Sequence, residues 1–332
     1  RTIWHRWTLA AFGYLTGLLG DLDKDADLNA DVNFCGVFQS AEDSKETLRL
    51  ARAIQNLPLD LVRPVTAEEA SKLCGTTISH NGVFFNRGGV LSPGKLCQLL
   101  LQQAKAIVHR GVRIDRLYLD GSKSGWIAEG QELDSRNVFD GEYDVVVLAT
   151  GPGTPDFKLT QAPFDIVRGQ MHYIPENSLP GLRSVICHSG YLTPGTGTGS
   201  TSNSSLAAGS TYSRTDVSTT AHLAGQKEIL QKLKTGVPDL KADLDLMPGF
   251  VGLRIACQDR MPLIGPVSGK PGLYVSTGHG SRGILSSPLA GEIIAAHVCG
   301  DPIPVESDLF DHFAERYTRR LASRNNDKRN RN

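Results

Sequence analysis

One continuous apolar segment constrains the fold of this chain more than any other feature. Val145-Val-Val-Leu-Ala149 runs directly into the glycine turn Thr150-Gly-Pro-Gly153. Such runs are typical of strands that a parallel sheet buries on both faces. We therefore predict a buried parallel strand over 142–151. Ligands of open α/β sheets bind beyond the carboxyl ends of the strands, so the Thr150-Gly151 turn is either a ligand contact or an ordinary tight turn.

Helical patterns dominate before this strand, and short strand-like segments follow it. Thr66 and Glu69 have the spacing of a capping box, and Ser92-Pro93 has the pattern of an N-cap followed by a first helical residue. The acidic run 21–27 is expected to be a solvated connection. Helices are predicted over 2–20, 42–56 and 218–235, from Thr66, from Ser92 and after Gly283. Segments typical of an antiparallel sheet are 166–174, 184–188, 205–212, 250–256 and 273–275.

This alternation predicts a discontinuous two-domain α/β protein. A parallel-sheet domain is paired with an antiparallel-sheet domain of α+β character, and each is built from separate stretches of the chain. The predicted parts are an N-terminal helical segment (1–30), the antiparallel-sheet domain (31–84 and 161–261), the parallel-sheet domain (85–160 and 262–315) and a basic tail (316–332).

Composition and short motifs exclude several classes of protein. Lys plus Arg is 35 and Asp plus Glu is 35, so the formal net charge is zero, which argues against a general nucleic-acid coat protein. No two of the six cysteines lie within four residues of each other, so a zinc knuckle is not expected and the thiols are predicted to be free. We expect no metal site, no membrane span and an intracellular, cytoplasmic protein.

A glycine-rich turn, Gly278-His-Gly-Ser-Arg-Gly283, precedes a predicted helix. Such a turn exposes backbone N–H groups at the positive end of the helix dipole, where they can bind an anion or an electron-rich ring oxygen. The spacing is Gly-x-Gly-x-x-Gly, but no following strand and acidic residue complete a Rossmann fingerprint. The turn is therefore either a cofactor contact or a simple helix entry.

Arg254 stands inside an otherwise apolar predicted strand. An arginine in this position either forms a buried ion pair, for example with Asp259, or projects into a cavity and binds a carboxylate through two hydrogen bonds. The pattern alone leaves both interpretations open.

Several of these segments, in this order, resemble the D-amino-acid-oxidase-like FAD-dependent oxidoreductases. The resemblance rests on Gly88-Gly89 with Pro93, on the Val-Val-Leu-Ala-Thr-Gly strand, on Gly-Leu-Arg254 followed by Asp-Arg-Met-Pro-Leu-Ile-Gly, and on the Gly278–Gly283 turn. Within that superfamily the chain is most similar to the oxidoreductase half of the bifunctional enzymes of tRNA 5-methylaminomethyl-2-thiouridine biosynthesis. The markers of that group are Asp31–Val37, Arg168-Gly-Gln170, Ser189–Pro194 and Gly280–Leu289.

The resemblance implies an enzyme that uses FAD to remove the carboxymethyl group from 5-carboxymethylaminomethyl-uridine at the tRNA wobble position. It also implies tRNA as substrate and a fused or separate methyltransferase as partner. Arg254 would hold the substrate carboxylate, with Tyr191 and Tyr212 lining the same pocket. The residues that would contact FAD are Thr150, Gly151, Gly278, Gly280, Ser281, Arg282, Gly283 and Ile284.

One departure from the family pattern concerns its first unit, a strand, Gly-x-Gly-x-x-Gly, helix and second strand. Nothing before residue 30 matches it, and we expect a chain without this unit to bind FAD weakly or not at all. Two other functions therefore stay open. One is an FAD-dependent oxidase of a small amino acid of the glycine or sarcosine type, and the other is a non-catalytic module with a flavoprotein-like fold.

Overall fold

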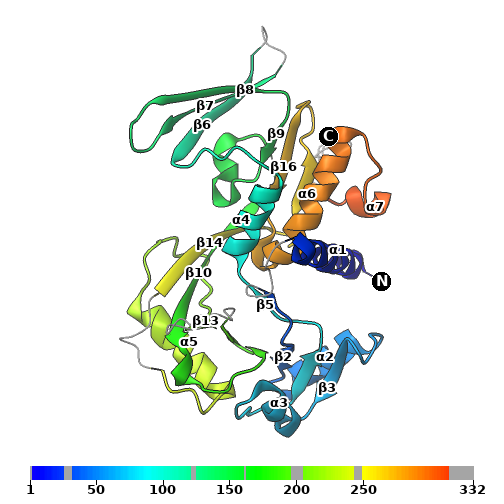
Figure 1. Ribbon diagram of the computed structural model, residues 1–332, viewed down its shortest axis with the longest axis vertical. Coiled ribbons are helices and arrows are strands. Elements are labelled where there is room, and N and C mark those ends of the chain that lie inside the picture. The colour runs from blue at the N-terminus through cyan, green and yellow to red at the C-terminus, as the bar shows by residue number, and fades with distance from the viewer. Residues whose placement is uncertain are drawn as a thin grey trace, which may run out of the picture. The chain divides into compact units, whose positions relative to one another are not determined.

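A computed structural model describes residues 2–25, 32–120, 125–160, 162–195, 205–242 and 249–313. The chain forms two units, each assembled from separate stretches (Figure 1). Unit 1 comprises 1–21, 105–167 and 253–332, and unit 2 comprises 22–104 and 168–252. The predicted parts assigned 85–104 to the parallel-sheet domain and 161–167 and 253–261 to the antiparallel-sheet domain, whereas 85–104 lie in unit 2 and the other two stretches in unit 1. The predicted basic tail, 316–332, lies outside the described residues.

The centre of unit 1 is a three-stranded sheet. Its middle strand, β16 (Leu273–Thr277), pairs in parallel with β9 (Val146–Leu148) and antiparallel with β15 (Leu263–Pro266). Helix α6 (Gly283–Cys299) packs on β15 and β16. Because β9 and β16 are parallel, their carboxyl ends and the turns that follow them meet at one edge of the sheet.

The apolar run that predicted a buried strand is divided in the structure. The first two residues of the predicted strand 142–151 belong to β8 (Val138–Tyr143), and only Val146–Leu148 form β9. The parallel pairing is confirmed, but the predicted burial is wrong, because Val145 is 38% and Val147 43% exposed. The reason is that β9 is the edge strand of its sheet within the described residues, while α6 covers the other two strands.

Helix α1 (Ile3–Asp25) packs in unit 1 against α6 and α7 (Ser307–Phe310). Trp7 and Phe313 are both almost fully buried, with ring centroids 4.5 Å apart. Arg6 donates two hydrogen bonds of 2.7 Å to Asp308, and Tyr14 donates one of 2.9 Å to Glu292. The predicted helix is confirmed but extends to Asp25, so the acidic run begins within the helix.

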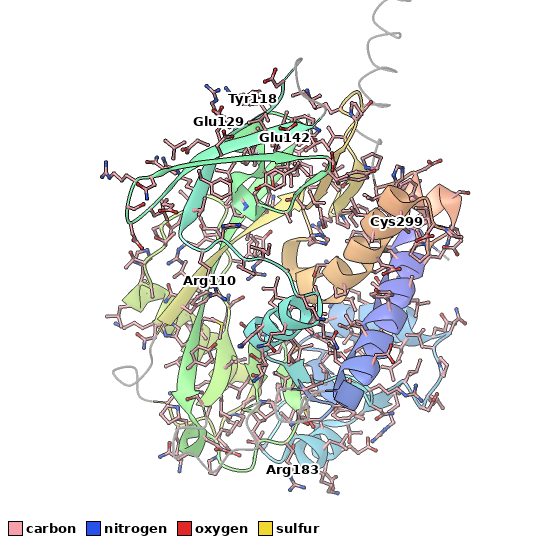
Figure 2. The ribbon with its side chains drawn as sticks, turned by 45° about the horizontal axis from the view of Figure 1, so that its top comes forward. Arg110, Tyr118, Glu129, Glu142, Arg183 and Cys299 are labelled. Atoms are coloured by element: carbon pink, nitrogen blue, oxygen red, sulfur yellow. The ribbon has the colours of Figure 1, made fainter. Side chains whose placement is uncertain are left out.

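A separate antiparallel meander in unit 1 consists of β6 (Val112–Leu119), β7 (Trp126–Glu132) and β8. Figure 2 shows Tyr118, Glu129 and Glu142 on this sheet, where the Tyr118 hydroxyl donates to the Glu129 carboxylate. Trp126 at the start of β7 is buried, and it packs with Leu148, Leu263 and Leu273 in a core on one face of the central sheet. Within the described part of the chain, no helix is both long and apolar enough to cross a bilayer.

Unit 2 contains most of an eight-stranded sheet, and the antiparallel sheet predicted for these segments is confirmed for most pairs. The exceptions are β11, which is parallel to β2, and segment 273–275, which belongs to unit 1. In spatial order the strands are β14 (Gly249–Cys257), β10 (Phe164–Pro175), β13 (Ser205–Gly209), β12 (Tyr191–Thr193), β11 (Val185–Cys187), β2 (Val37–Ser40), β4 (Gly82–Phe85) and β3 (Val62–Val65). A small second sheet pairs β1 (Val32–Asn33) with β5 (Val90–Leu91).

Helices α3 (Ala67–Cys74) and α5 (Leu223–Gly236) cover one face of the large sheet. Their apolar residues join side chains from alternate positions of the strands in the main core of unit 2. Helix α2 (Ser44–Ile54) packs on β3 and β4, and α4 (Pro93–Gln103) begins at the predicted Ser92 N-cap. All six cysteines are free thiols.

The predicted capping box at α3 is confirmed. The Thr66 hydroxyl accepts a 3.2 Å hydrogen bond from the Glu69 N–H, and the Glu69 carboxylate accepts one of 3.0 Å from the Thr66 N–H. Replacing Thr66 with alanine is therefore expected to lower the free energy of unfolding by about 1 kcal/mol. Urea denaturation followed by circular dichroism measures the change. A serine at this position is the control and should recover most of the loss, and an alanine variant as stable as the parent would contradict the prediction.

Candidate functional site

A cavity of about 280 Å³ lies in unit 1 at the edge where β9 and β16 end. The strands and turns around it contribute mostly small or apolar side chains, with Arg254 as the single charged residue. The lining residues are Ala149, Gly151, Pro152, Leu253, Arg254, Ile255, Ser276, Thr277, Gly278, His279, Gly280 and Ser287. The cavity therefore unites the two glycine turns and the strand arginine that the sequence singled out separately.

The turn between β16 and α6 requires glycine at two positions. Gly278 has a φ of +72° and Gly280 a φ of +58°, both in the left-handed region that favours glycine. A Cβ at Gly278 would lie 2.5 Å from the Cys257 sulfur, so even alanine collides there. This close approach brings the backbone of the turn to the cavity wall at the N-terminal end of α6, where free N–H groups and the helix dipole favour negative charge.

Arg254 is half-buried on β14 and faces the cavity. No hydrogen bond or ion pair joins its guanidinium to any other residue that the structure describes, and Asp259 accepts instead from the Met261 N–H at 3.2 Å. The ion-pair interpretation of Arg254 is therefore wrong within the described chain. A partly buried guanidinium without a partner is suited to binding a carboxylate, because the ligand would supply the missing counter-charge.

The side chain of His279, within the turn, is hydrogen-bonded to two serines, Ser276 and Ser286. The Ser286 hydroxyl donates to the Arg282 carbonyl oxygen at 2.8 Å, so it accepts from His279 Nδ1, also at 2.8 Å. Nε2 is then the unprotonated nitrogen, 3.2 Å from the Ser276 hydroxyl, which donates to it. Burial lowers the pKa of His279 to about 4, so the imidazole is neutral at physiological pH.

A chain of three threonine hydroxyls connects the two strand ends. Thr150 Oγ1 lies 3.1 Å from Thr154 Oγ1, which lies 3.2 Å from Thr277 Oγ1. Thr154 and Thr277 are almost fully buried. The hydroxyl chain therefore fixes the turn after β9 relative to the turn after β16, and with it the two sides of the cavity.

Some predicted cofactor contacts lie outside the cavity lining. Ser281 and Arg282 are exposed, Ile284 is 44% exposed, and Gly283 is the first residue of α6. The Arg282 guanidinium lies over the Trp4 ring, 4.7 Å from its centroid. The structure thus brings together Gly151, Arg254, Gly278 and Gly280, with Thr150 next to them.

The two predicted pocket tyrosines belong to unit 2. Tyr191 is half-buried at the start of β12, and its hydroxyl donates to the Met171 sulfur at 3.7 Å. Tyr212 is 60% exposed and accepts hydrogen bonds of 3.3 Å from the Arg214 guanidinium. Their assignment to the pocket of Arg254 stays a prediction.

The marker residues Arg168 and Gln170 have a structural role in unit 2. Arg168 is 3% exposed and donates to the carbonyl oxygens of Ser218 and Thr220. Gln170 is fully buried and bonds the backbone of His222 through both ends of its carboxamide. These bonds attach the segment before α5 to strand β10, which explains the two residues without a catalytic role.

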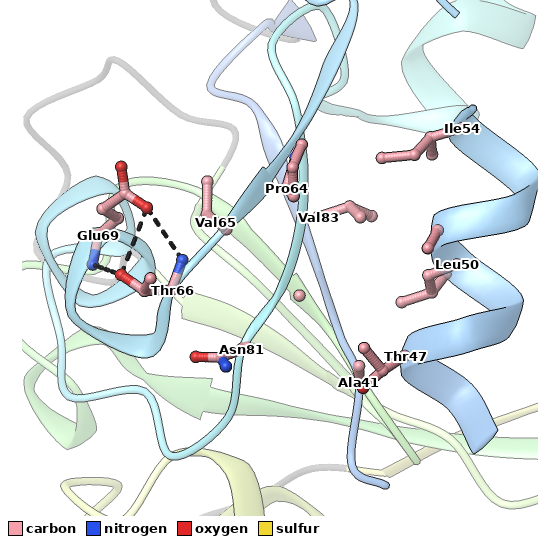
Figure 3. Close-up of a pocket in the computed structure, with 12 residues that line it drawn as sticks. Ala41, Thr47, Leu50, Ile54, Pro64, Val65, Thr66, Glu69, Asn81 and Val83 are labelled. Atoms are coloured by element: carbon pink, nitrogen blue, oxygen red, sulfur yellow. Dashed lines mark hydrogen bonds between the residues drawn. The ribbon is translucent and has the colours of Figure 1, made fainter. Parts of the chain in front are cut away.

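A second cavity has a different character. It has a volume of about 570 Å³ in unit 2, between α2 and strands β3 and β4, and Figure 3 shows its mostly apolar walls. Its one charged lining residue, Glu69, is already bonded to Thr66 in the capping box. This cavity therefore lacks the unpartnered charge that marks the smaller one.

Sequence reasoning missed the supporting residues Thr154, Ser276, Thr277 and Ser286. Hydroxyl residues are too common for their positions to have been informative, and Thr154 meets Thr277 across 123 residues of sequence. The histidine between Gly278 and Gly280 was a detectable signal, since a titratable residue inside a glycine turn is unusual. Among the described residues, no three His, Cys, Asp or Glu side chains are grouped as metal ligands.

The half-buried, neutral His279 predicts that unit 1 loses stability in acid. Its folded-state pKa of about 4 lies below the unfolded value near 6.5, so protonation favours the unfolded chain. The stability that His279 contributes is complete above pH 6.5 and decreases by about 3 kcal/mol as the pH falls to 4. Urea denaturation at several pH values measures this loss. A His279→Gln variant should lose less stability over the same range, and parallel pH profiles for the two proteins would contradict the prediction.

Comparisons with known proteins identify the family of this chain. The sequence model of a family described as FAD dependent oxidoreductase matches residues 3–297. The tRNA 5-methylaminomethyl-2-thiouridine biosynthesis bifunctional protein of Aeromonas salmonicida (strain A449) is 31% identical over 95% of this chain and 51% of its own length. The protein of the same name from Thiobacillus denitrificans is 32% identical over 92% of this chain and 48% of its own length. The chain thus spans about half the length of these curated relatives.

Solved structures share the fold at lower identity. Glycine oxidase from Geobacillus kaustophilus superposes with a TM-score of 0.72 at 19% identity, covering 89% of this chain and 78% of its own. Iminodiacetate oxidase from Chelativorans sp. BNC1 gives 0.71 at 21% identity, with 91% and 82% covered. The family match spans most of the chain, and the cavity joins its glycine turns to an arginine. The chain therefore belongs to the FAD-dependent oxidoreductases, the family of the D-amino-acid-oxidase-like enzymes.

Proposed function

We propose that this chain catalyses the FAD-dependent removal of the carboxymethyl group from 5-carboxymethylaminomethyl-uridine at the tRNA wobble position. The observation that carries the proposal is Arg254, a half-buried guanidinium that faces the cavity and has no partner among the described residues. The modified uridine bears a carboxylate on the carbon next to a secondary amine. The curated relatives, which are named for tRNA 5-methylaminomethyl-2-thiouridine biosynthesis, support this substrate.

The residues around the cavity fit part of a flavin. Gly278 and Gly280 have left-handed backbone conformations and leave no side chain between the turn and Cys257 and Ala256 of β14, and the start of α6 presents backbone N–H groups. Gly278, Gly280 and Gly283 would lie against the cofactor, with Thr150 and Gly151 on the other side of the cavity. His279 would stay neutral and hold the turn in place through its hydrogen bonds to Ser276 and Ser286.

The reaction needs orientation more than acid–base catalysis. Bound FAD supplies the acceptor for the hydride that leaves the carbon between the amine and the carboxylate. Arg254 would bind the carboxylate through two parallel hydrogen bonds and so fix which carbon is presented. Water then hydrolyses the resulting imine, which gives aminomethyl-uridine and glyoxylate. A tRNA substrate would place the chain in the cytoplasm, with a fused or separate methyltransferase acting on the product.

A small amino acid is the second candidate substrate. The specific observation in its favour is the cavity volume of about 280 Å³, which suits a molecule of the size of glycine or sarcosine. Both candidates place a carboxylate on Arg254, so this residue does not distinguish them.

The experiment is a comparison of substrates with FAD supplied in excess. tRNA that carries 5-carboxymethylaminomethyl-uridine is incubated with the protein, digested and examined by nucleoside mass spectrometry, while glycine and sarcosine are assayed by oxygen consumption. Conversion of the tRNA nucleoside to aminomethyl-uridine supports the proposal. Oxidation of glycine without conversion of the tRNA would overturn it in favour of the amino acid oxidase, and inactivity on every substrate would overturn both.

A further inference from the structure

Two chains of side-chain hydrogen bonds lie beside the cavity of unit 1, and they end differently. In the first, the Ser276 hydroxyl donates to His279, His279 donates to Ser286, and Ser286 donates to the Arg282 carbonyl oxygen. A carbonyl oxygen has no hydrogen to pass on, so this chain is complete within the protein. The second chain joins three threonine hydroxyls, and no described residue provides such an acceptor at either of its ends.

The threonine chain has more hydroxyl hydrogens than contacts. Thr150, Thr154 and Thr277 each carry one hydroxyl hydrogen, whereas only two hydrogen bonds join them, of 3.1 Å and 3.2 Å. None of the three hydroxyls bonds any other residue that the structure describes. One hydrogen therefore has no acceptor in the described chain, and its place depends on the direction in which the hydroxyls donate.

Burial decides this direction. Thr154 is fully buried and Thr277 is 2% exposed, whereas Thr150 is exposed. If the hydroxyls donated inward, the unused hydrogen would be buried at Thr277, and if both outer hydroxyls donated to Thr154, it would be buried there. If they donate outward, both buried hydrogens are used and the remaining one is at Thr150, where a ligand can accept it. A buried donor without an acceptor is unfavourable, so the outward direction is preferred by about tenfold or more.

The local backbone leaves the Thr150 hydroxyl free for a ligand. Thr150 is the N-cap residue of the short 3-10 helix Gly151–Phe157, a position where a threonine hydroxyl commonly accepts a hydrogen bond from a backbone N–H. Here its side chain makes no capping hydrogen bond. Its neighbours Ala149 and Gly151 both line the cavity, so the unused hydrogen lies beside the cavity that would hold the flavin.

We infer that Thr154 is a positioning residue, which makes the exposed Thr150 hydroxyl a hydrogen-bond donor to an acceptor oxygen of the bound flavin cofactor. Thr277 supplies the hydrogen bond that holds Thr154 in this orientation. A hydroxyl that accepts a hydrogen bond is also a stronger donor, because consecutive hydrogen bonds polarise one another. The inference goes beyond the proposed function, since it concerns the cofactor and applies to either candidate substrate.

The test is a mutant cycle in which FAD affinity is measured without turnover. FAD is titrated with protein, and binding is followed by the flavin fluorescence. Thr150→Val removes the donor and is expected to weaken binding about tenfold. The paired variant Thr154→Val/Thr277→Val removes both buried hydroxyls together, so no buried hydrogen is left without an acceptor, and it should weaken binding about threefold to fivefold.

The decisive variant combines all three substitutions. If Thr154 acts through Thr150, removing the buried pair has no further effect once residue 150 is valine, so the triple variant should bind FAD as well as Thr150→Val does. A purely structural effect of the buried pair would weaken binding equally in both backgrounds, and that result overturns the inference. Thr154→Ser, with Thr277 unchanged, keeps the hydroxyl chain and should bind FAD like the parent.

A matched control comes from helix α1 of the same unit. Among the described residues, the Thr16 hydroxyl bonds only carbonyl oxygens of its own helix, those of Phe12 and Gly13, each at 3.0 Å. Thr16→Val therefore removes a comparable hydroxyl from unit 1 and should leave FAD affinity unchanged. Thermal unfolding of every variant separates loss of affinity from loss of folding.

The outcomes separate this inference from the proposed function. If the parent converts modified tRNA but the paired variant binds FAD as tightly as the parent, the role of Thr154 is wrong and the reaction stands. If the cycle behaves as expected while no tRNA nucleoside is converted, the role of Thr154 stands and the reaction is wrong. A parent protein that binds no FAD overturns the inference. Neutron diffraction gives an independent check, because the hydroxyl hydrogen of Thr277 must be found between Thr277 and Thr154.

Discussion

Replacing Arg254 with leucine is expected to lower kcat/KM for the carboxylate-bearing amine by about two to three orders of magnitude. The guanidinium faces the cavity, and no other described residue neutralises it, so the substrate carboxylate would be its counter-charge. Leucine removes both hydrogen bonds to that carboxylate and leaves it desolvated without a partner. Steady-state kinetics with saturating FAD measures the change.

Lysine at position 254 is the informative control. It keeps the charge but loses the planar pair of donors, so we expect an activity between those of the parent and the leucine variant. Loss of the carboxylate contact should also abolish discrimination, so the leucine variant and the parent should oxidise an amine without a carboxylate at similar rates. A leucine variant with normal kcat/KM for the carboxylate substrate would contradict the role of Arg254.

The second large effect is expected at Gly278, where alanine should lower the free energy of unfolding of unit 1 by about 4 kcal/mol. Two costs contribute. The residue has a φ of +72°, which is unfavourable for any L side chain, and its Cβ would lie 2.5 Å from the Cys257 sulfur. The turn cannot relax freely, because β16 and α6 hold it at both ends. Urea denaturation followed by tryptophan fluorescence measures the loss, because Trp4, Trp7 and Trp126 all belong to unit 1.

Gly291 provides a control of opposite sign. It lies within α6, is exposed and has nothing within 4 Å of an added Cβ. Alanine there should stabilise the protein by up to about 1 kcal/mol, because alanine is a better helix former than glycine. If both substitutions shift stability in the same direction by similar amounts, the argument from backbone conformation and close approach at Gly278 fails.

The features that could be predicted from the sequence depend on neighbouring residues. The capping box at Thr66 follows from the three-residue spacing to Glu69, and the Ser92 N-cap follows from the proline next to it; both are present. The apolar run of β9 correctly predicted a parallel strand, but its prediction that the strand is buried was wrong. Burial depends on which elements cover a strand, and among the described strands α6 packs mainly on β15 and β16. A local pattern carries no information about that coverage.

The candidate site shows the same limit. Arg254 and the glycine turn were recognisable as unusual residues in their segments. The sequence did not show whether Arg254 has an ionic partner, whereas in the structure no described residue pairs with it and Asp259 accepts from the Met261 N–H. The buried Thr154 and Thr277 hydroxyls come from distant parts of the chain, so no local sequence spacing could predict the contact between them.

The discontinuous assembly of unit 1 has a consequence for folding kinetics. Arg6 and Asp308, which hold α1 to the segment after α6, are 302 residues apart in sequence. Contacts between such distant residues are slow to form, because a long loop must close before they contribute stability. During synthesis the apolar face of α1 therefore stays uncovered until the segment that forms α6 has been made. We expect folding yield to depend on chaperones and on the rate of translation, with early aggregates that involve the Trp7 face of α1.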